Sequence, residues 1–335
     1  MKTYWTAVAV ALMFGLAAET AIGAKPPSDR GSGGAGEYPN RPVRIIVPFP
    51  AGGGVDITNR IVSAKLTEVL GQQIVIENRS GAGGNVGAEA AARSTPDGYT
   101  LFACGVASHG VSPAIYKKLP FDPVKDFAPI SMIGTTPNVL VVHPAVPAKT
   151  VAEFIAHAKA GGGKIPYASP GLGTSPHMTM ELFKLATSIN LVHVPYKGGA
   201  PALQDVMGGH IIGMFGNLSE QIGAIKAGRT RALAVSSLKR HPQLPDVPTV
   251  AESGVPGFEV TSWAASCVPA AVPRPILEKL NAAFVKTINT PEIRDRLVQQ
   301  AIEVAPSTRD ELAAYIKSEI AKWTKVAQSA GISLD

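Results

Sequence analysis

Residues 43–61 read VRIIVPFPAGGGVDITNRI and contain a strand, a turn and the start of a helix. The β-branched run at 43–49 predicts a strand, and residues 57–70 carry apolar side chains at helical spacing. Prolines and three consecutive glycines fill the turn between them. A strand that leads through a tight turn into a helix is the repeating unit of α/β proteins, so this stretch predicts the fold class.

The same unit recurs in three further stretches, which read IVIENRSGAGGNVGAEAA (74–91), KIPYASPGLGTSPHMTMELF (164–183) and LVHVPYKGGAPALQDV (191–206). The alternation predicts an α/β fold with largely parallel sheets. Strands are expected at 73–77, 100–103, 127–133, 138–143, 165–168, 191–195, 211–216 and 232–236, and helices at 85–93 and 151–160. The C-terminal part is mostly helical, with helices expected at 276–288, after Thr290-Pro291, and from the capping box Thr308-x-x-Glu311 to Gln328.

The N-terminus has the pattern of a secretory signal peptide. Lys2 precedes an apolar run at 6–18, and small residues follow at Ala21, Gly23 and Ala24. Residues 1–24 are therefore expected to be cleaved, although an uncleaved anchor helix is an alternative. Residues 25–37 are expected to form a flexible tail, and the mature protein to lie outside the cytoplasm.

Composition limits the classes of protein. The chain has 335 residues, enough for two domains, and its 45% hydrophobic and 17% charged residues are typical of a globular protein. The formal net charge of +6 comes from scattered Lys and Arg residues, whereas a nucleic-acid binder usually clusters them. No nucleic-acid partner is therefore expected.

The chain has two cysteines, Cys104 and Cys267, and both lie in apolar strand-like runs. An oxidising compartment permits a disulfide between them. Two buried free thiols fit the sequence equally well, because the sequence does not fix the distance between them.

The glycine-rich turns are candidates for an anion-binding site. Glycine lets the backbone approach a ligand closely, and a helix start offers unpaired N–H groups and the positive end of the helix dipole. In open α/β sheets such turns gather at the carboxyl ends of the strands, where ligands bind. Tight connections without a ligand are the alternative for each turn. A dinucleotide motif is excluded, since Val86 stands where G-x-G-x-x-G from Gly81 needs glycine.

Catalytic and metal-binding patterns are weak. The sequence has no H-E-x-x-H, G-x-S-x-G or C-x-x-C motif, and its seven histidines are dispersed, so no metal or cofactor is expected. His177 lies in the first turn of the third unit's helix, where an imidazole either donates to a carboxylate or serves in packing. Asp56 is interpreted as a helix cap, and Trp263 as a cleft wall or a core residue.

Taken together, these motifs resemble the Bug family, the TctC-type substrate-binding receptors of tripartite tricarboxylate transporters. The resemblance covers nearly all of residues 38–335, and the matching stretches are 42–60, 71–101, 115–130, 168–183, 192–211 and 244–259. It implies a two-lobed periplasmic-binding-protein (Venus-flytrap) fold, type II-like, with lobe one at 38–134 plus 258–335 and lobe two at 135–257. It also implies a monomeric periplasmic receptor, not an enzyme, that passes a small carboxylate ligand to integral-membrane transporter subunits.

The resemblance further implies where the solute binds. Main-chain N–H groups of Ala51–Gly53 and Ala82–Asn85 are expected to hold a ligand carboxylate, and lobe two to contact its distal end. The expected ligand-binding residues are Phe49, Ala51, Gly52, Gly53, Asp56, Ala82, Gly83, Gly84, Asn85, Ser108, Ser169, Thr174, Ser175, His177, Tyr196, Lys197, Asn217 and Trp263.

The sequence departs from the family near the distal end. Gly213 and Gly216 stand where family members often carry Asp, and Ser112 precedes a proline where they often carry Asn. The class of ligand is therefore expected to transfer, whereas its identity is not. Two alternatives remain. One is an orphan sensor that binds a carboxylate and signals through a membrane partner, and the other is a periplasmic hydrolase that uses Ser169 or Ser175 with His177.

Overall fold

The computed structural model describes residues 38–334. The expected signal peptide at 1–24 and the expected tail at 25–37 lie outside the described residues. Within the described part, no helix is both long enough and apolar enough to cross a membrane.

One sheet of ten strands runs through residues 38–334, in the order β2-β1-β3-β9-β4-β7-β5-β6, and β8 and β10 also pair with β4. The strands are β1 (Val43–Val47), β2 (Ile74–Asn78), β3 (Thr100–Gly105), β4 (Phe127–Val142), β5 (Pro166–Ser169), β6 (Val192–Pro195), β7 (Gly213–Asn217), β8 (Arg231–Val235), β9 (Thr261–Pro269) and β10 (Glu303–Val304). The helices are α1 (Gly54–Leu70), η1 (Ala82–Gly84), α2 (Asn85–Ala92), η2 (Ala107–Val111), α3 (Ser112–Ile115), α4 (Val151–Ala160), α5 (Ser175–Thr187), α6 (Gly199–Met207), α7 (Leu218–Lys226), α8 (Arg274–Ile288), α9 (Pro291–Gln299) and α10 (Arg309–Ala330).

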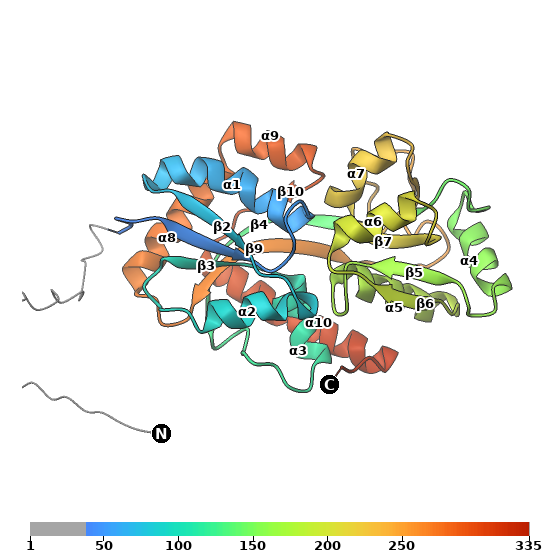
Figure 1. Cartoon of the computed structure of the whole chain (residues 1–335), viewed down its shortest axis with the longest axis horizontal. Coiled ribbons are helices and arrows are strands. Elements are labelled where there is room, and N and C mark those ends of the chain that lie inside the picture. Colours follow the sequence, from blue (N-terminus) through green and yellow to red (C-terminus); the bar gives the residue numbers. More distant parts are fainter. Residues whose placement is uncertain (1–37, 335) are drawn as a thin grey trace, which may run out of the picture.

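The elements form two lobes (Figure 1). Lobe one surrounds β1, β2 and β3 and carries α1, α2, α8 and α9, whereas lobe two surrounds β5, β6 and β7 and carries α4, α5, α6 and α7. The antiparallel pair β4 and β9 connects the lobes. The last helix, α10, packs on α3, β4 and α5, so it contacts both lobes. The chain therefore passes from lobe one into lobe two and back.

Strand directions differ between the lobes and their connection. β1 pairs in parallel with β2 and β3, and β5 pairs in parallel with β6 and β7. The ladders of β3 on β9 and of β7, β8 and β10 on β4 are antiparallel. The expectation of largely parallel sheets therefore holds only away from β4 and β9, because the chain that crosses between the lobes must also return.

β1 shows why the opening stretch is apolar along most of its length. Successive side chains of a strand point to opposite faces of the sheet. Ile45 belongs to a buried cluster with Leu66 of α1 and Phe284 of α8, and Ile46 belongs to a second cluster with Ala88 of α2. Because helices cover both faces, the strand needs apolar side chains on both.

Most predicted elements are present within a few residues of their expected bounds, and the capping box is confirmed. The N–H of Glu311 donates to Thr308 Oγ1 at 3.2 Å, and the N–H of Thr308 donates to Glu311 Oε2 at 2.8 Å. One prediction is wrong: residues 127–133 and 138–143 form one strand, β4, and not two. The segment between them stays extended because it pairs with β9, and Gly134 also pairs with β10.

The two cysteines form a disulfide between β3 and β9. The Cα atoms of Cys104 and Cys267 are 5.8 Å apart, and both residues are buried. Of the two states that the sequence allows, the structure therefore has the bonded one.

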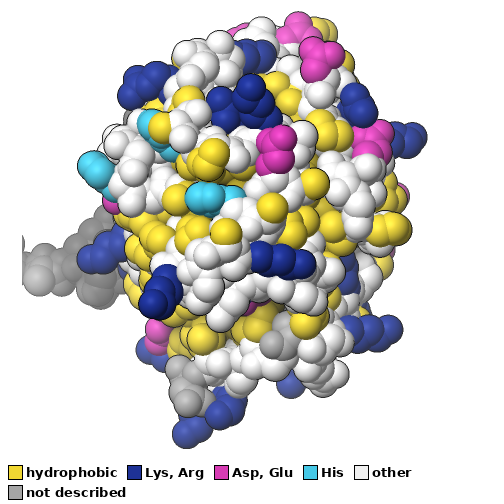
Figure 2. Space-filling view, turned by 90° about the vertical axis from the view of Figure 1, so that its right-hand side faces the viewer, with side chains coloured by type: hydrophobic (Ala, Val, Ile, Leu, Met, Phe, Trp, Pro, Cys, Tyr) yellow, Lys and Arg dark blue, Asp and Glu magenta, His cyan; other side chains and the backbone are white. Residues whose placement is uncertain are grey.

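Charged side chains are dispersed over the end of the molecule that lobe two forms (Figure 2). On this face, Lys and Arg side chains lie among hydrophobic, acidic and histidine side chains and do not gather into one basic patch. This distribution agrees with the scattered positive charge of the sequence.

Candidate functional site

All four glycine-rich turns meet at one pocket between the lobes. The pocket encloses about 60 Å³, which is room for a few water molecules or a small solute at roughly 10–15 Å³ per water. Strand β9 and the segment after β3 complete its wall. The turns contribute residues 48–50 and Gly53, residues 83–84, Pro170 with residues 174–176, and residues 198–201.

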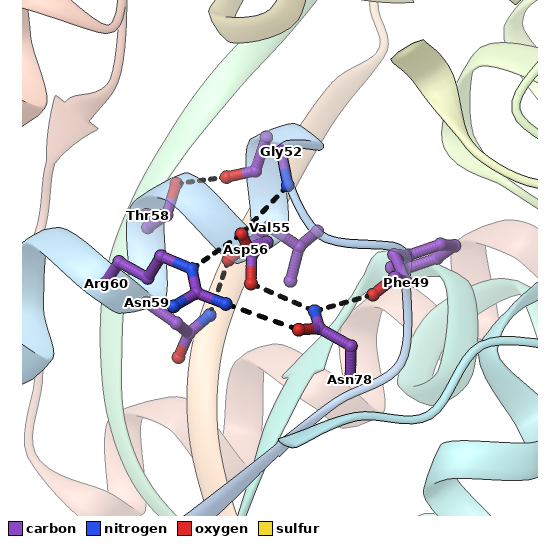
Figure 3. A network of polar contacts seen from close by, with 9 residues as sticks. Phe49, Gly52, Val55, Asp56, Thr58, Asn59, Arg60 and Asn78 are labelled. Atoms are coloured by element: carbon purple, nitrogen blue, oxygen red, sulfur yellow. Dashed lines mark hydrogen bonds and ion pairs between the residues drawn. The ribbon is translucent and has the colours of Figure 1, made fainter. Parts of the chain in front are cut away.

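Asp56 holds the first turn in shape (Figure 3). Its Oδ2 accepts the N–H of Gly52 at 2.9 Å and the Nε–H of Arg60 at 2.8 Å, and its Oδ1 accepts the side-chain amide of Asn78 at 2.9 Å. Burial raises the pKa of Asp56, but these bonds outweigh burial and hold the pKa below its usual value. The helix cap is Gly53, so Asp56 braces the turn from inside the helix and lies outside the pocket lining.

Most N–H groups of the first turn already have partners. The N–H of Gly52 donates to Asp56, and that of Gly53 donates to the carbonyl of Pro50 at 3.4 Å. Within residues 38–334 the N–H groups of Phe49 and Ala51 in this turn have no partner; Phe49 lines the pocket, whereas Ala51 and Gly52 are exposed and do not. Of the predicted trio Ala51–Gly53, only Gly53 lines the pocket.

The second turn combines a left-handed backbone with unused donors. Residues Gly81, Ala82, Gly83 and Gly84 all have positive φ, from 47° at Ala82 to 141° at Gly81. This conformation is uncommon for alanine, and such strain persists where a functional loop requires it. The N–H groups of Ala82 and Gly83 make no hydrogen bond within the described residues, and Gly83 lines the pocket. These two groups lie just before α2 and are candidates for holding an anion.

The two lobes touch on both sides of the pocket. A Cβ atom on Gly83 would overlap the carbonyl oxygen of Leu172 in the third turn. A Cβ atom on Gly198 in the fourth turn would lie 3.1 Å from the ring of Pro50. The described arrangement is therefore a closed one, in which glycines allow the turns of opposite lobes to approach.

Ser169 and His177 lie outside the pocket lining, beneath the third turn. Ser169 Oγ is 2.6 Å from Nε2 of His193, and His177 Nδ1 accepts the N–H of Gly173 at 3.2 Å. The two imidazoles stack with 4.2 Å between ring centroids. Burial lowers the pKa of His177 to about 4 and that of His193 to about 3, so both are neutral near pH 7. The imidazole of His177 fixes the turn and does not line the pocket in this arrangement, and contact with a ligand stays a prediction.

Thr174 and Ser175 do line the pocket, and both are fixed by neighbours. Thr174 Oγ1 donates to the carbonyl of Gly171 at 2.7 Å, and Ser175 Oγ accepts the side-chain amide of Asn138 at 2.8 Å. Neither Ser169 nor Ser175 is hydrogen-bonded to His177 within residues 38–334, so the serine–histidine pairs considered for a hydrolase are not assembled.

The fourth turn meets the pocket with its backbone. The Tyr196 hydroxyl donates to Asp205 of α6, and burial together with that bond raises the pKa of Tyr196 to about 12. Lys197 is exposed, and neither side chain lines the pocket. Gly198 and Gly199 line the pocket at this turn, and ligand contact by Tyr196 and Lys197 stays a prediction.

The remaining expected residues lie in two places. Phe49, Ser108, Asn217 and Trp263 line the pocket. Trp263 is also buried and donates its indole N–H to Glu319 at 3.1 Å, so it is a wall and a core residue at once. Asn85 lies outside the lining, where its Oδ1 accepts the hydroxyl of Ser112 at 2.8 Å.

Comparison with known proteins identifies the family. Residues 58–332 match the family described as the tripartite tricarboxylate transporter family receptor. This chain belongs to that receptor family. It is also similar to the solved periplasmic binding protein BugD, at 33% identity and a TM-score of 0.85 over 88% of this chain and 99% of the other. The protein is therefore a Bug-type receptor with the two-lobed fold.

Two further similar proteins have been solved with a ligand. Rpa4515 of R. palustris with adipate is 35% identical, with a TM-score of 0.86 over 88% of this chain and 99% of the other. MatC of Rhodopseudomonas palustris with bound malate is 32% identical, with a TM-score of 0.81 over 86% of this chain and 99% of the other.

Gly216 lies next to the pocket residue Asn217. A Cβ atom on Gly216 would overlap the side-chain nitrogen of Gln221, so a larger residue at this position would require Gln221 to move.

The receptor pocket also contains Glu220, which the sequence did not single out. It lies in the first turn of α7, where acidic residues are common because they favour the positive end of the helix dipole. Two glycines that are distant in sequence, Gly54 and Gly199, lie beside the carboxylate of Glu220 in the fold. The sequence around Glu220 contains no local pattern that predicts these contacts.

Proposed function

We propose that this receptor binds a small carboxylate-bearing solute between its lobes and delivers it to a tripartite tricarboxylate-type transporter. The observation that carries the proposal is the pair of unpartnered N–H groups on Ala82 and Gly83. They lie at the positive end of α2, in a turn that lines the pocket. A hydrogen bond to a carboxylate contributes ~1.5–3 kcal/mol, so two such donors are enough to favour an anion.

The solved relatives support this class of ligand. Rpa4515 was solved with adipate and MatC with malate. Both ligands carry carboxylates, but they differ in length and in hydroxyl content. The relatives therefore support a carboxylate ligand and leave its distal part to the residues of this chain.

A thermal-shift screen over mono-, di- and tricarboxylates, amino acids and aromatic acids tests the proposal. A ligand at about 100 times its Kd should add ~2.7 kcal/mol to the free energy of unfolding. Stabilisation by at least one carboxylate, with no turnover of ester and amide panels, is the expected result. Turnover of an ester or amide, or the absence of stabilisation by every acid, would overturn it.

We also propose where the receptor works and how its lobes are bounded. Residues 1–24 have the pattern of a signal peptide, and BugD is a periplasmic binding protein, which supports a monomer in the periplasm that meets integral-membrane subunits. The proposed bounds are 38–134 plus 258–335 for lobe one and 135–257 for lobe two. Intact-mass measurement of secreted protein should give a start near residues 22–25, and retention of Met1 would contradict cleavage.

A further inference from the structure

Glu220 reaches from lobe two to the first helix of lobe one. Its Oε1 accepts the N–H of Gly54, the first residue of α1, at 2.9 Å. A Cβ atom on Gly54 would lie 2.9 Å from Glu220 Cγ, and a Cβ atom on Gly199 would overlap Oε2. Two glycines from opposite lobes therefore make room for this one carboxylate.

The second oxygen of this carboxylate is left without a partner. Glu220 Oε2 is inaccessible to solvent and accepts no hydrogen bond within residues 38–334. No cationic side chain of the described residues forms an ion pair with it. Burial raises the pKa of Glu220, and the bond from Gly54 and the side chain of Asn217 offset this only in part. A buried acceptor left unpaired destabilises the folded protein, and a hydrogen bond to it removes that cost.

Asn217 presents a second acceptor of the same kind. Its Oδ1 is buried without a hydrogen-bond partner in the described part of the chain, and both Asn217 and Glu220 line the pocket. Lobe one contributes unused donors at Ala82 and Gly83. Lobe two contributes two unpaired acceptors on residues of the pocket wall, and both oxygens are covered by protein atoms in the described arrangement, so a solute reaches them only when these side chains turn towards the pocket.

We propose that the pocket selects carboxylates that also carry a hydrogen-bond donor, above all an ammonium group. In this proposal the side-chain oxygens of Glu220 and Asn217 accept the hydrogen bonds of that donor. The inference rests on the proposed function, since it assumes that a carboxylate lies on the second turn. A donor on the solute satisfies the unpaired acceptors, and a positive charge beside Glu220 favours its ionised form, which burial alone disfavours. A second carboxylate at the same place offers no donor to these oxygens and further disfavours the ionised form of Glu220.

Titration calorimetry on matched acids of equal carbon number tests the selection. The triplets are propionate, β-alanine and malonate; butyrate, γ-aminobutyrate and succinate; and valerate, δ-aminovalerate and glutarate. At the best-fitting length, we expect the amino acid to bind at least tenfold more tightly than either partner, a difference of about 1.4 kcal/mol. Glu220→Gln should remove this advantage and strengthen binding of the diacid.

Two further variants make the test specific. Asn217→Ala should reduce the preference for the amine while the unsubstituted acid still binds. Glu278→Gln is the matched control, because Glu278 is exposed on α8 and, among residues 38–334, forms an ion pair only with Arg274. It should leave all affinities unchanged.

The outcomes separate failure of this inference from failure of the proposed function. Diacids that bind as tightly as amino acids, in an order that Glu220→Gln does not alter, would overturn the inference and leave a carboxylate receptor standing. Equal weakening of all acids by Glu220→Gln would also overturn it, since Glu220 would then only join the lobes. Absence of binding by any acid would remove the proposed function and the inference together.

Discussion

The position of Gly83 does not accommodate a side chain, for two independent reasons. Its φ is 64°, and its position lies against the carbonyl oxygen of Leu172. A β-branched side chain would force the turn out of its left-handed conformation or push the lobes apart. Either change displaces the N–H groups proposed to hold the carboxylate. We expect Gly83→Val to weaken solute binding at least tenfold, about 1.4 kcal/mol, in titration calorimetry.

Gly71→Val provides the control for backbone strain alone. Gly71 ends α1 with a φ of 69°, and nothing lies within 4 Å of a Cβ atom there. This variant should lower the free energy of unfolding and leave solute affinity unchanged. Normal binding by Gly83→Val would instead return the second turn to the alternative of a tight connection without a ligand.

Single residues of the site were predictable from the sequence where their conformation depends on neighbouring residues in the chain. The glycines of the turns were found because a positive φ and a helix start leave a mark in the sequence within a few residues. The sequence did not indicate that Ser169 and His177 share the partner His193, because His193 comes from the next strand and no local pattern links the three residues. Glu220 was missed because its surroundings are assembled from both lobes.

Among the elements, β6 and α5 are joined by the stacked imidazoles of His193 and His177. Their pKa values in the folded state, about 3 and about 4, lie below the ordinary 6.5. The unfolded chain therefore binds more protons than the folded one once the pH falls below 6.5. We expect the free energy of unfolding to fall as pH decreases from 6.5 towards about 4, measured by urea denaturation across this window.

The double variant His177→Gln/His193→Gln isolates this contribution from that of the carboxylates. Glutamine does not titrate, so the loss of stability in the same pH window should be smaller than in the natural protein. An unchanged pH dependence would show that the imidazoles are protonated in the folded state or accessible to water.

The disulfide joins β3 to β9, which is one of the two strands that connect the lobes. The bond closes a segment of 163 residues, and long closed segments restrict the unfolded chain most. We expect Cys104→Ala/Cys267→Ala to lower the free energy of unfolding by ~2–4 kcal/mol in urea denaturation. Treatment of the natural protein with a reductant should produce a similar loss, and equal stability of both forms would argue against the bond.

Elements were predictable wherever their pattern is continuous in the sequence. The helix from Thr308 was found because its capping box lies within four residues of chain. β4 was divided in two because its middle, which contains Pro137, has the composition of a turn. Pairing with β9, a strand more than a hundred residues later, keeps it extended, and a local pattern does not carry that information.

At the scale of the whole molecule, the lobes are described in contact around a small pocket. The lobes approach each other closely at Gly83 and Gly198, and separation of the lobes would widen the entrance to the pocket. We expect the free receptor to be more extended than the liganded one. Small-angle X-ray scattering should show a smaller radius of gyration at saturating solute. An unchanged value would indicate that the closed form is the resting state.

The path of the chain between the lobes bears on how such receptors diversify. The chain leaves lobe one along β4 and returns along β9, and Gly134 of the outgoing strand pairs with Ala264 of the returning one. Everything between is one uninterrupted stretch, and it includes Asn217 and Glu220. A recombination event with one crossover in each strand would transfer this lobe whole, with both junctions side by side. Such an exchange would move the lobe-two side of the pocket between homologous genes as one unit, while the recipient keeps the glycine-rich turns of its own lobe one.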